Sequence, residues 1–165
     1  MSKSSGFTLI EIMIAVVIIG ILSAIAFPSY TAQVQKSRRS DAMVMLTSAS
    51  NLQERALTKS GSYTLVLNEL NGHGSTSEHG YYQFKVLTDN TPSGTTVTAS
   101  VTMSPTDTVS QTLSCAGENC FQMAAVATGS QVQDTDCLIF TIDHLGRKRS
   151  YNSAGNKNSI GTCWK

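Results

Sequence analysis

Glu11 is the only acidic residue in a long apolar stretch near the N-terminus. The 21 residues 7–27 contain no Lys, Arg or His. A charged, unpaired carboxylate in an apolar environment costs on the order of several kcal/mol, so Glu11 needs a cationic partner. A backbone amine is the remaining source of positive charge. The chain gains such an amine close to Glu11 only if it is cut just upstream, and Gly6–Phe7 is the obvious junction.

The stretch itself predicts a transmembrane helix. At about 1.5 Å per residue, residues 7–27 reach about 31 Å, which matches the hydrocarbon core of a bilayer. Two other interpretations are an ordinary secretory signal cut after Ala24-Ile25-Ala26 and an uncleaved anchor. Neither gives Glu11 or the Gly6–Phe7 junction a role, so we favour a processed membrane anchor.

Length and charge limit what the rest of the chain can be. With 165 residues and about 30 used in the apolar segment, one further domain of roughly 110 to 135 residues is expected. The formal net charge is +1 and the charged fraction is 14%, so neither a basic nucleic-acid footprint nor an acidic one stands out. Partners must therefore be inferred from local features.

The four cysteines all follow the apolar stretch. An even number in an exported region favours disulfides, and we pair Cys137 with Cys163 and Cys115 with Cys120. Because the positively charged residues flank both sides of the stretch, the positive-inside rule is ambiguous. Oxidised cysteines place the C-terminal domain outside the cytoplasm.

Two sites with reactive chemistry are disfavoured. A zinc site would use Cys115, Cys120, His73 and His79, but the C-x4-C pair has no matching second pair and the compartment favours disulfides. We expect His73 and His79 to be solvated loop residues instead. A hydrolase would use the Asp143–His144 dipeptide, but the chain has neither a nucleophile elbow nor a glycine-rich oxyanion loop. We predict no enzyme, no metal and no cofactor.

A long helix must carry the N-terminal features. Periodicity resumes after Pro28, which predicts one bent helix over residues 7–59, with a transmembrane half at 7–27 and an amphipathic half at 28–59. Ser60-Gly61-Ser62 supplies the stop signal. The apolar stripe of the second half consists of Ala42, Met45, Ala49, Leu52 and Ala56. Nearby, Arg38, Arg39 and Asp41 are expected where the helix meets the globular domain, where they could pair between subunits, or equally on a solvated helix face.

Residues 60–165 are expected to form a globular β domain. Alternating patterns predict strands at 82–86 and 97–103, joined into an antiparallel hairpin by the turn at 91–94, and further strands at 121–128 and 138–142. The simplest fold that buries both faces is α+β. In it, the long helix packs on a three- or four-stranded antiparallel sheet.

The N-terminal sequence strongly resembles the class III signal of type IV pilins. The match comprises a short leader with Lys3 (residues 1–6), Gly6 before the cut, Phe7 after it, Glu11 and an uninterrupted hydrophobic helix. The tail, with Cys137, Gly146 and the closing residues 161–165, is similar to the disulfide-bounded C-terminal region of pilins, closest in style to PilE-like minor pilins.

The resemblance implies roles for the N-terminal residues. A prepilin peptidase would cut after Gly6 and methylate the new amine of Phe7, which stays cationic. Glu11 would then pair with this amine, either within one chain or in a neighbouring subunit. Gly20 and Pro28 match the positions between which the helix unwinds in assembled pili, and both residue types weaken helices.

The C-terminal loop is the second implied site. The loop closed by Cys137 and Cys163 corresponds to the variable region that mediates lateral contacts or adhesion, and here it carries Arg147, Lys148 and Arg149. These three cations are a weak footprint for DNA phosphates or a partner. The Cys115–Cys120 loop departs from the pattern of two-cysteine pilins.

The resemblance therefore predicts a structural subunit of a type IV pilus, most similar to a minor pilin, that serves motility, adhesion or DNA uptake. Its partners would be other pilin subunits, the prepilin peptidase and an inner-membrane assembly platform, with residues 7–27 in the membrane. The subunit would lie in the bacterial inner membrane before assembly and in the extracellular pilus afterwards. The alternatives are a type II secretion pseudopilin, which the disulfide loop argues against, and a DNA-binding receptor pilin.

Overall fold

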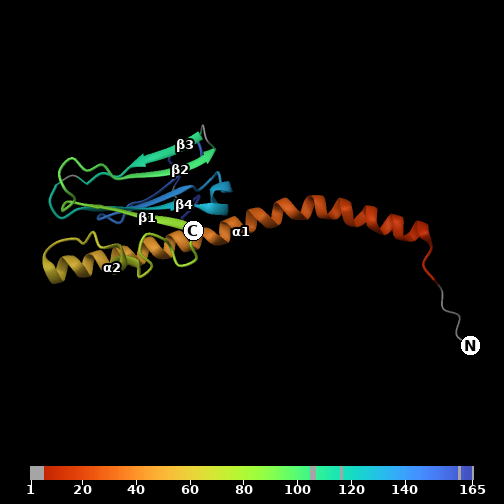
Figure 1. Cartoon of the computed structure of the whole chain (residues 1–165), viewed down its shortest axis with the longest axis horizontal. Helices are drawn as coiled ribbons and strands as arrows, with labels where there is room; N and C mark the ends of the chain where they lie inside the picture. Colours follow the sequence, from red (N-terminus) through yellow and green to blue (C-terminus); the bar gives the residue numbers. More distant parts are fainter. Residues whose placement is uncertain (1–5, 105–106, 116, 160, 165) are drawn as a thin grey trace, which may run out of the picture. The chain divides into compact units, whose positions relative to one another are not determined.

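The computed structural model describes residues 6–104, 107–115, 117–159 and 161–164. The chain forms two compact units that divide between Gln35 and Lys36. The first unit contains the N-terminal part of a long helix, and the second contains the rest of that helix, two sheets and the loops between them (Figure 1).

Helix α1 extends from Leu9 to Ser60. It begins at an N-cap: the Thr8 hydroxyl accepts a hydrogen bond from the Glu11 N–H at 3.3 Å, and the Thr8 carbonyl accepts one from the Ile12 N–H. It ends where Gly61, with a φ of 74°, donates to the Leu57 carbonyl, as in a left-handed C-cap. The prediction of one helix that continues through Pro28 to the glycine stop is confirmed.

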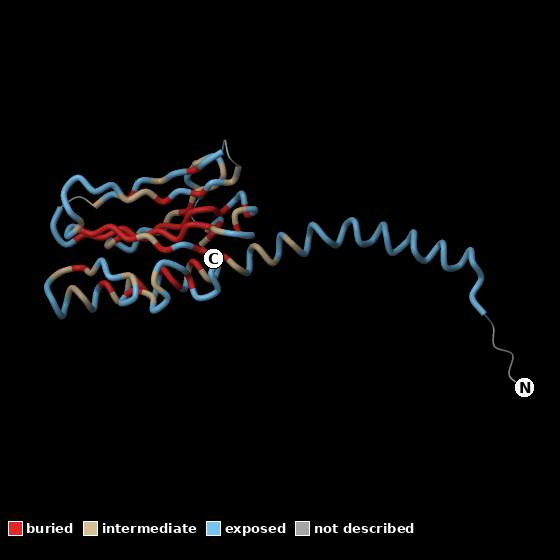
Figure 2. Tube along the Cα trace, viewed as in Figure 1, coloured by how far each residue is buried: buried red, intermediate tan, exposed pale blue. Residues whose placement is uncertain are grey.

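In the first unit, α1 is exposed over most of its length. Every residue from Gly6 to Tyr30 is exposed (Figure 2). An 18-residue window of this helix has a mean hydropathy of 2.8, and α1 is long and apolar enough to cross a membrane. Its apolar surface is the kind that lipid or another apolar helix covers.

In the second unit, α1 packs one face into the core. Its buried residues are Arg39, Ala42, Met45, Leu46, Ala49 and Gln53. The first three residues of the predicted apolar stripe, Ala42, Met45 and Ala49, are buried as expected. Its last two, Leu52 and Ala56, are only half-buried, and Leu46 and Gln53 are buried in their place. The Gln53 side chain is accommodated because it donates to the Thr64 carbonyl at 2.8 Å and accepts from the Thr64 N–H at 2.9 Å. A short helix, α2 (Leu67–Asn71), follows.

The main sheet is antiparallel and has four strands in the order β1-β4-β5-β6. These are β1 (Tyr82–Thr88), β4 (Phe121–Ala127), β5 (Ile139–Asp143) and β6 (Lys148–Tyr151). All seven residues of β4 are buried, which suits a central strand covered on both faces. The α+β fold with a helix on a four-stranded antiparallel sheet is thus confirmed.

The predicted hairpin between residues 82–86 and 97–103 is wrong. β1 pairs with β4, and β2 (Thr98–Ser104) pairs with β3 (Asp107–Thr112) in a separate two-stranded sheet. The predicted turn exists, since Thr95 donates to the Pro92 carbonyl, but it leads the chain out of the main sheet. The fully buried β4 takes the place beside β1 because a central strand needs a neighbour on each edge. β3 and β6 were not predicted.

Two disulfides join the cysteines in the predicted pairs. Cys137 and Cys163 are separated by 26 positions, with Cα atoms 5.9 Å apart, and Cys115 and Cys120 by 5 positions, with Cα atoms 5.6 Å apart. Cys137 and Cys163 are both buried, so this bridge links the C-terminal tail to the start of β5 inside the core.

We expect the two disulfides to differ in their effect on stability. Replacing Cys137 and Cys163 by Ala should lower the free energy of unfolding by about 3.5 kcal/mol, and replacing Cys115 and Cys120 by about 2 kcal/mol, because the longer loop restricts the unfolded chain more. Chemical denaturation of the full chain in detergent micelles measures both. A larger loss for the Cys115–Cys120 pair would contradict this ranking.

Candidate functional site

The predicted processing residues, Gly6 and Phe7, lie just ahead of α1, and Glu11 lies in its first turn. Phe7 is 79% exposed. Glu11 is exposed, and within the part of the chain that the structure describes it forms no ion pair. A Cβ added to Gly20 would meet nothing within 4 Å, so contacts within the chain do not require a glycine there.

Glu11 also stands beside a helix N-cap that the sequence interpretation missed. Its N–H is bound by the Thr8 hydroxyl, and Glu11 stands three positions after this N-cap, the spacing of a capping box. An acid in the first turn is further stabilised by the positive end of the helix dipole. The T-x-x-E pattern of residues 8–11 was the available signal.

The predicted basic cluster lies around one buried carboxylate. Arg147 Nε is 2.7 Å from Asp143 Oδ2, and Arg149 Nη1 is 3.3 Å from the same oxygen. Asp143 also accepts the N–H groups of Leu145 and Arg147, which shapes the turn between β5 and β6. Burial raises the pKa of Asp143, but the hydrogen bonds and charge of Arg147 lower it more, so the net pKa is below the usual value.

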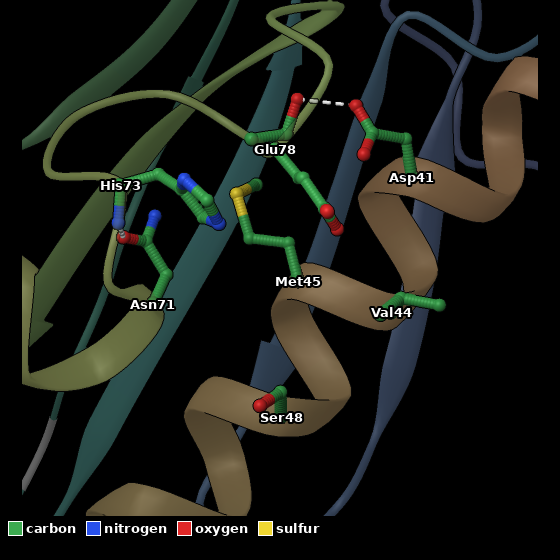
Figure 3. Close-up of a pocket in the computed structure, with 8 residues that line it drawn as sticks. Asp41, Val44, Met45, Ser48, Asn71, His73 and Glu78 are labelled. Atoms are coloured by element: carbon green, nitrogen blue, oxygen red, sulfur yellow. Dashed lines mark hydrogen bonds between the residues drawn. The ribbon is translucent and has the colours of Figure 1, made fainter.

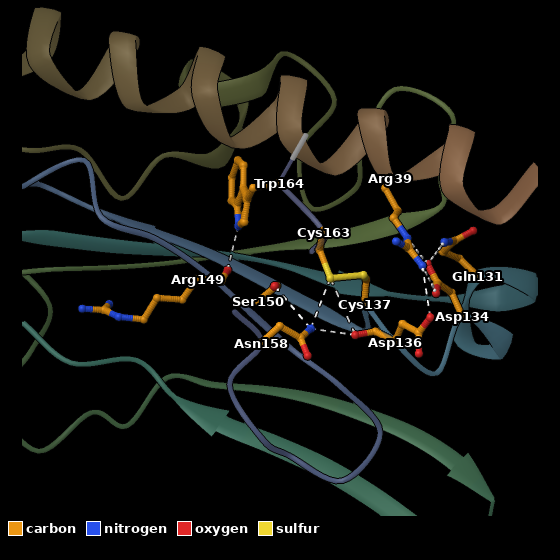
Figure 4. The surroundings of a disulfide bond; sticks show 10 residues. All are labelled: Arg39, Gln131, Asp134, Asp136, Cys137, Arg149, Ser150, Asn158, Cys163 and Trp164. Atoms are coloured by element: carbon orange, nitrogen blue, oxygen red, sulfur yellow. Dashed lines mark hydrogen bonds and ion pairs between the residues drawn. A yellow bond between two sulfur atoms is a disulfide. The ribbon is translucent and has the colours of Figure 1, made fainter. Parts of the chain in front are cut away.

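Lys148 points to the C-terminal tail. Its Nζ lies 5.1 Å from the centre of the Trp164 ring, a cation–π contact. Trp164 donates from Nε1 to the Arg149 carbonyl at 2.9 Å (Figure 4). Its ring also packs edge-on against Phe140. The three predicted cations are therefore brought together at β6, but two of them are partly neutralised by Asp143.

A buried ion pair lies on the other side of the Cys137–Cys163 bridge. Arg39 donates from Nε and Nη2 to the two carboxylate oxygens of Asp134, each at 2.7 Å, and Gln131 donates to the same carboxylate (Figure 4). The hydrogen bond to Asp134 raises the pKa of Arg39, although burial opposes it. Arg39 is 8% exposed and Asp134 3%. Arg39 therefore lies where the helix meets the globular domain, as one of the two expectations had it, and the alternative of a solvated face is wrong for this residue.

Comparison with known proteins identifies the family. Residues 28–117 match the model of a family described as the type IV minor pilin ComP, DNA uptake sequence receptor. Residues 1–27 match the prokaryotic N-terminal methylation motif. The chain belongs to this minor pilin family.

Relatives of this pilin include other pilus proteins. It is 38% identical over 68 residues to the type IV major pilin protein PilA of Myxococcus xanthus, which covers 41% of this chain and 31% of that protein. It is 36% identical over 101 residues to the fimbrial protein EcpB of Eikenella corrodens, a match that covers 61% of this chain and 62% of that protein. Fimbrial protein Q of Moraxella bovis is 42% identical over 57 residues, a match that covers 34% of this chain and 36% of that protein. The pilin thus spans about a third of the length of the first relatives.

A second polar cluster of the pilin joins α1 to the loop before β1. Asp41 accepts hydrogen bonds from the Ser77 hydroxyl and from His79, whose Nδ1 lies 3.1 Å from Oδ1. The hydrogen bond to Asp41 raises the pKa of His79. Because Ser77 donates to a carboxylate and not to a histidine, the cluster fixes a loop and does not form a Ser–His pair.

A small pocket of about 150 Å³ lies beside this cluster. Asp41, Met45, His73 and Glu78 are among the residues that line it (Figure 3). His79, expected as a solvated loop residue, is exposed but attached to Asp41. The sequence did not indicate Ser77 or Asp134 as partners of α1, because they come from loops far along the chain.

The lowered pKa of Asp143 predicts a pH dependence of stability. Its ionised form favours the folded pilin above the unfolded pKa of about 3.9. This contribution is lost as the pH falls through the folded pKa. At pH 7, Asp143→Asn should lower the free energy of unfolding by about 1–2 kcal/mol, because it removes the ion pairs but keeps an acceptor for the turn.

The difference between Asp143→Asn and the native chain should shrink below pH 4. Thermal unfolding at several pH values measures this, with the exposed Asp107→Asn as the matched control, for which little effect is expected at any pH. A deficit of Asp143→Asn that stays constant from pH 7 to pH 3 would rule out this electrostatic contribution.

Proposed function

We propose that this protein is a minor subunit of a type IV pilus, cut after Gly6, held in the inner membrane by its N-terminal helix and then assembled into the filament. The observation that carries the proposal is the exposed apolar helix with Glu11 in its first turn. Membership of the minor pilin family and the methylation motif over residues 1–27 support it.

The apolar helix is suited to two surroundings. In the membrane, residues 7–27 match the thickness of the hydrocarbon core. In a filament, the same side chains pack against copies or other pilins, which are equally apolar, so extraction need not expose them to water. Among the described residues nothing lies within 4 Å of a Cβ added at Gly20, so this position is open to contact with a neighbouring helix.

Cleavage after Gly6 would supply the charge that Glu11 lacks. The amine of Phe7 would stand one residue before the Thr8 N-cap, where it adds positive charge to the helix end. Glu11 lies in the first turn and can neutralise it, in the same chain or in the next subunit. The energy of an unpaired charge in apolar surroundings makes this neutralisation a condition of assembly.

The charge of Glu11 and its capping role can be separated. Glu11→Gln keeps the capping-box residue type and removes the charge. Thr8→Ala removes the cap hydroxyl and keeps the charge. We expect Glu11→Gln to lower incorporation into sheared pili by about tenfold or more. Thr8→Ala should change it little.

Immunoblots of sheared pili against membranes measure incorporation, with the exposed Glu118→Gln as control. Processing at Gly6 should be checked in every variant, because an uncut chain would not assemble for a different reason. Normal incorporation of Glu11→Gln would contradict a role for its charge.

DNA binding is a second candidate function, favoured by the description of the matched family as a DNA uptake sequence receptor. The chain offers cations for phosphates in the loop closed by Cys137 and Cys163. Arg147 is tied to Asp143 but keeps 57% of its side chain exposed, and Lys148 and Lys157 form no ion pair among the described residues. The formal net charge of +1 means that such binding must be local.

Salt dependence tests this candidate. If Lys148 and Lys157 contact phosphates, replacing both by Gln should weaken binding to a short duplex and reduce the slope of log affinity against log salt by about 1 for each cation removed. Fluorescence anisotropy with the full chain in micelles measures it. The matched control replaces Arg55 and Lys59 at the end of α1. Failure of the native chain to bind any duplex at low salt would reject the DNA function and leave the pilus function standing.

A further inference from the structure

An uncharged groove lies between the two sheets of the second unit. Its volume is about 460 Å³, within the range of ligand-binding clefts. One wall is β2 and the other is formed by the end of β4 and the 3-10 helix η1 (Gly129–Gln133), with Gln83 of β1 beside them. None of the residues that line it carries an ionisable side chain.

The lining combines hydrogen-bonding groups with small apolar surfaces. Gln83 and Gln133 are both exposed and supply carboxamides, and Thr102 and Thr128 supply hydroxyls. Met103 and Val132 are half-buried and provide apolar contact. Carboxamides and hydroxyls both donate and accept hydrogen bonds without charge.

The backbone of β2 adds further groups to this wall. Leu113 donates to the Val97 carbonyl, so the odd-numbered residues of β2 form the hydrogen-bonded pairs with β3. The N–H and C=O groups of Ser100 and Thr102 therefore point to the other edge of β2, where no strand pairs with them among the described residues. Four consecutive residues, 100–103, line the groove, as expected of a strand that faces it with its backbone edge.

The face of the small sheet next to the groove is also uncharged and carries hydroxyls in cross-strand pairs. Ser100 and Ser110 lie 3.0 Å apart through their hydroxyls, and Thr108 donates to Thr102 at 3.3 Å. Thr98 and Thr112 are paired next in the register. Ser100 and Thr102 belong to both surfaces, so the groove continues into this row of hydroxyls.

These features select the ligand by chemistry. Phosphates and nucleic acids need cations, and the groove has none. By contrast, the pocket beside Asp41 contains Glu78, and a pocket next to the Cys137–Cys163 bridge contains Lys36 and Arg39. A neutral sugar chain presents many hydroxyls that donate and accept, together with apolar C–H faces, and matches the carboxamides, hydroxyls and apolar side chains of the groove.

We propose that the groove between β2 and the β4–η1 segment binds a neutral oligosaccharide, with Gln83 and Gln133 as its main hydrogen-bonding side chains. An extended peptide that adds to the free edge of β2 is the competing occupant. The lining favours the sugar, because it offers polar side chains on both walls. This proposal is independent of DNA binding.

The test uses the full chain in dodecylphosphocholine micelles, since detergents with sugar head groups would compete. Cellohexaose, maltohexaose and hexa-N-acetylchitohexaose, all neutral, serve as probes, and binding is measured by calorimetry and by amide chemical shifts. At least one should bind with millimolar or better affinity and shift the amides of Ser100 and Thr102. Gln83→Ala combined with Gln133→Ala should weaken binding by about tenfold.

The control and a second variant keep the outcome interpretable. Asn51→Ala removes an exposed carboxamide from α1, away from the groove, and should leave binding unchanged. Thr102→Val removes one hydroxyl with little change in volume and should weaken binding severalfold, with the unfolding temperature checked in each case.

Three results would overturn the proposal: no binding of any neutral oligosaccharide, binding that the groove variants leave intact, or preferential binding of polygalacturonate, an acidic polymer. A fourth is specific to the competing occupant. If a synthetic peptide with the sequence of residues 107–112 shifts the Ser100 and Thr102 amides and the sugars do not, the groove accepts a strand.

Discussion

One constraint governs this protein: the apolar N-terminal half of α1 is exposed in the single chain and must be covered by lipid or by other helices. From Gly6 to Tyr30 no side chain of α1 is buried, and the one charged group, Glu11, has no ionic partner among the described residues. Water is therefore the wrong surrounding for this segment. Membrane lipid and a bundle of similar helices are the two surroundings that satisfy it, and the proposed function takes the chain from one to the other.

The second unit holds its part of α1 by specific polar contacts as well as by apolar packing. Arg39 reaches Asp134 through two hydrogen bonds, and Asp41 binds Ser77 and His79. Removing one partner of a buried ion pair costs about 3–5 kcal/mol. The Arg39–Asp134 pair therefore fixes the position of the helix on the sheet more strictly than the packing of Ala42 and Ala49 does alone. The Cys137–Cys163 bridge fixes the tail on the neighbouring strands, and the sheet therefore presents its loops in a defined arrangement.

Much of this architecture could be predicted from the sequence, and the failures have physical reasons. The extent of α1, the apolar β4 and the cysteine pairs follow from local patterns and composition. The hairpin between β1 and β2 was wrong because a turn fixes local direction but not which strand takes the neighbouring place in the sheet. The position of Arg39 beside the globular domain was among the expectations, but its partner, Asp134, was not identified, because it is 95 positions away. The cations at β6 were found, but their restraint by Asp143 was not, since strand β6 itself was missed.

The central claim is that cleavage after Gly6 creates the positive charge that Glu11 requires. Mass spectrometry of the mature N-terminus, from protein purified out of sheared pili, tests it most directly. The account predicts a chain that begins with N-methylated Phe7. A mature protein that begins at Met1 or at Phe27 would contradict it, because Glu11 would then have no nearby amine or would itself have been removed.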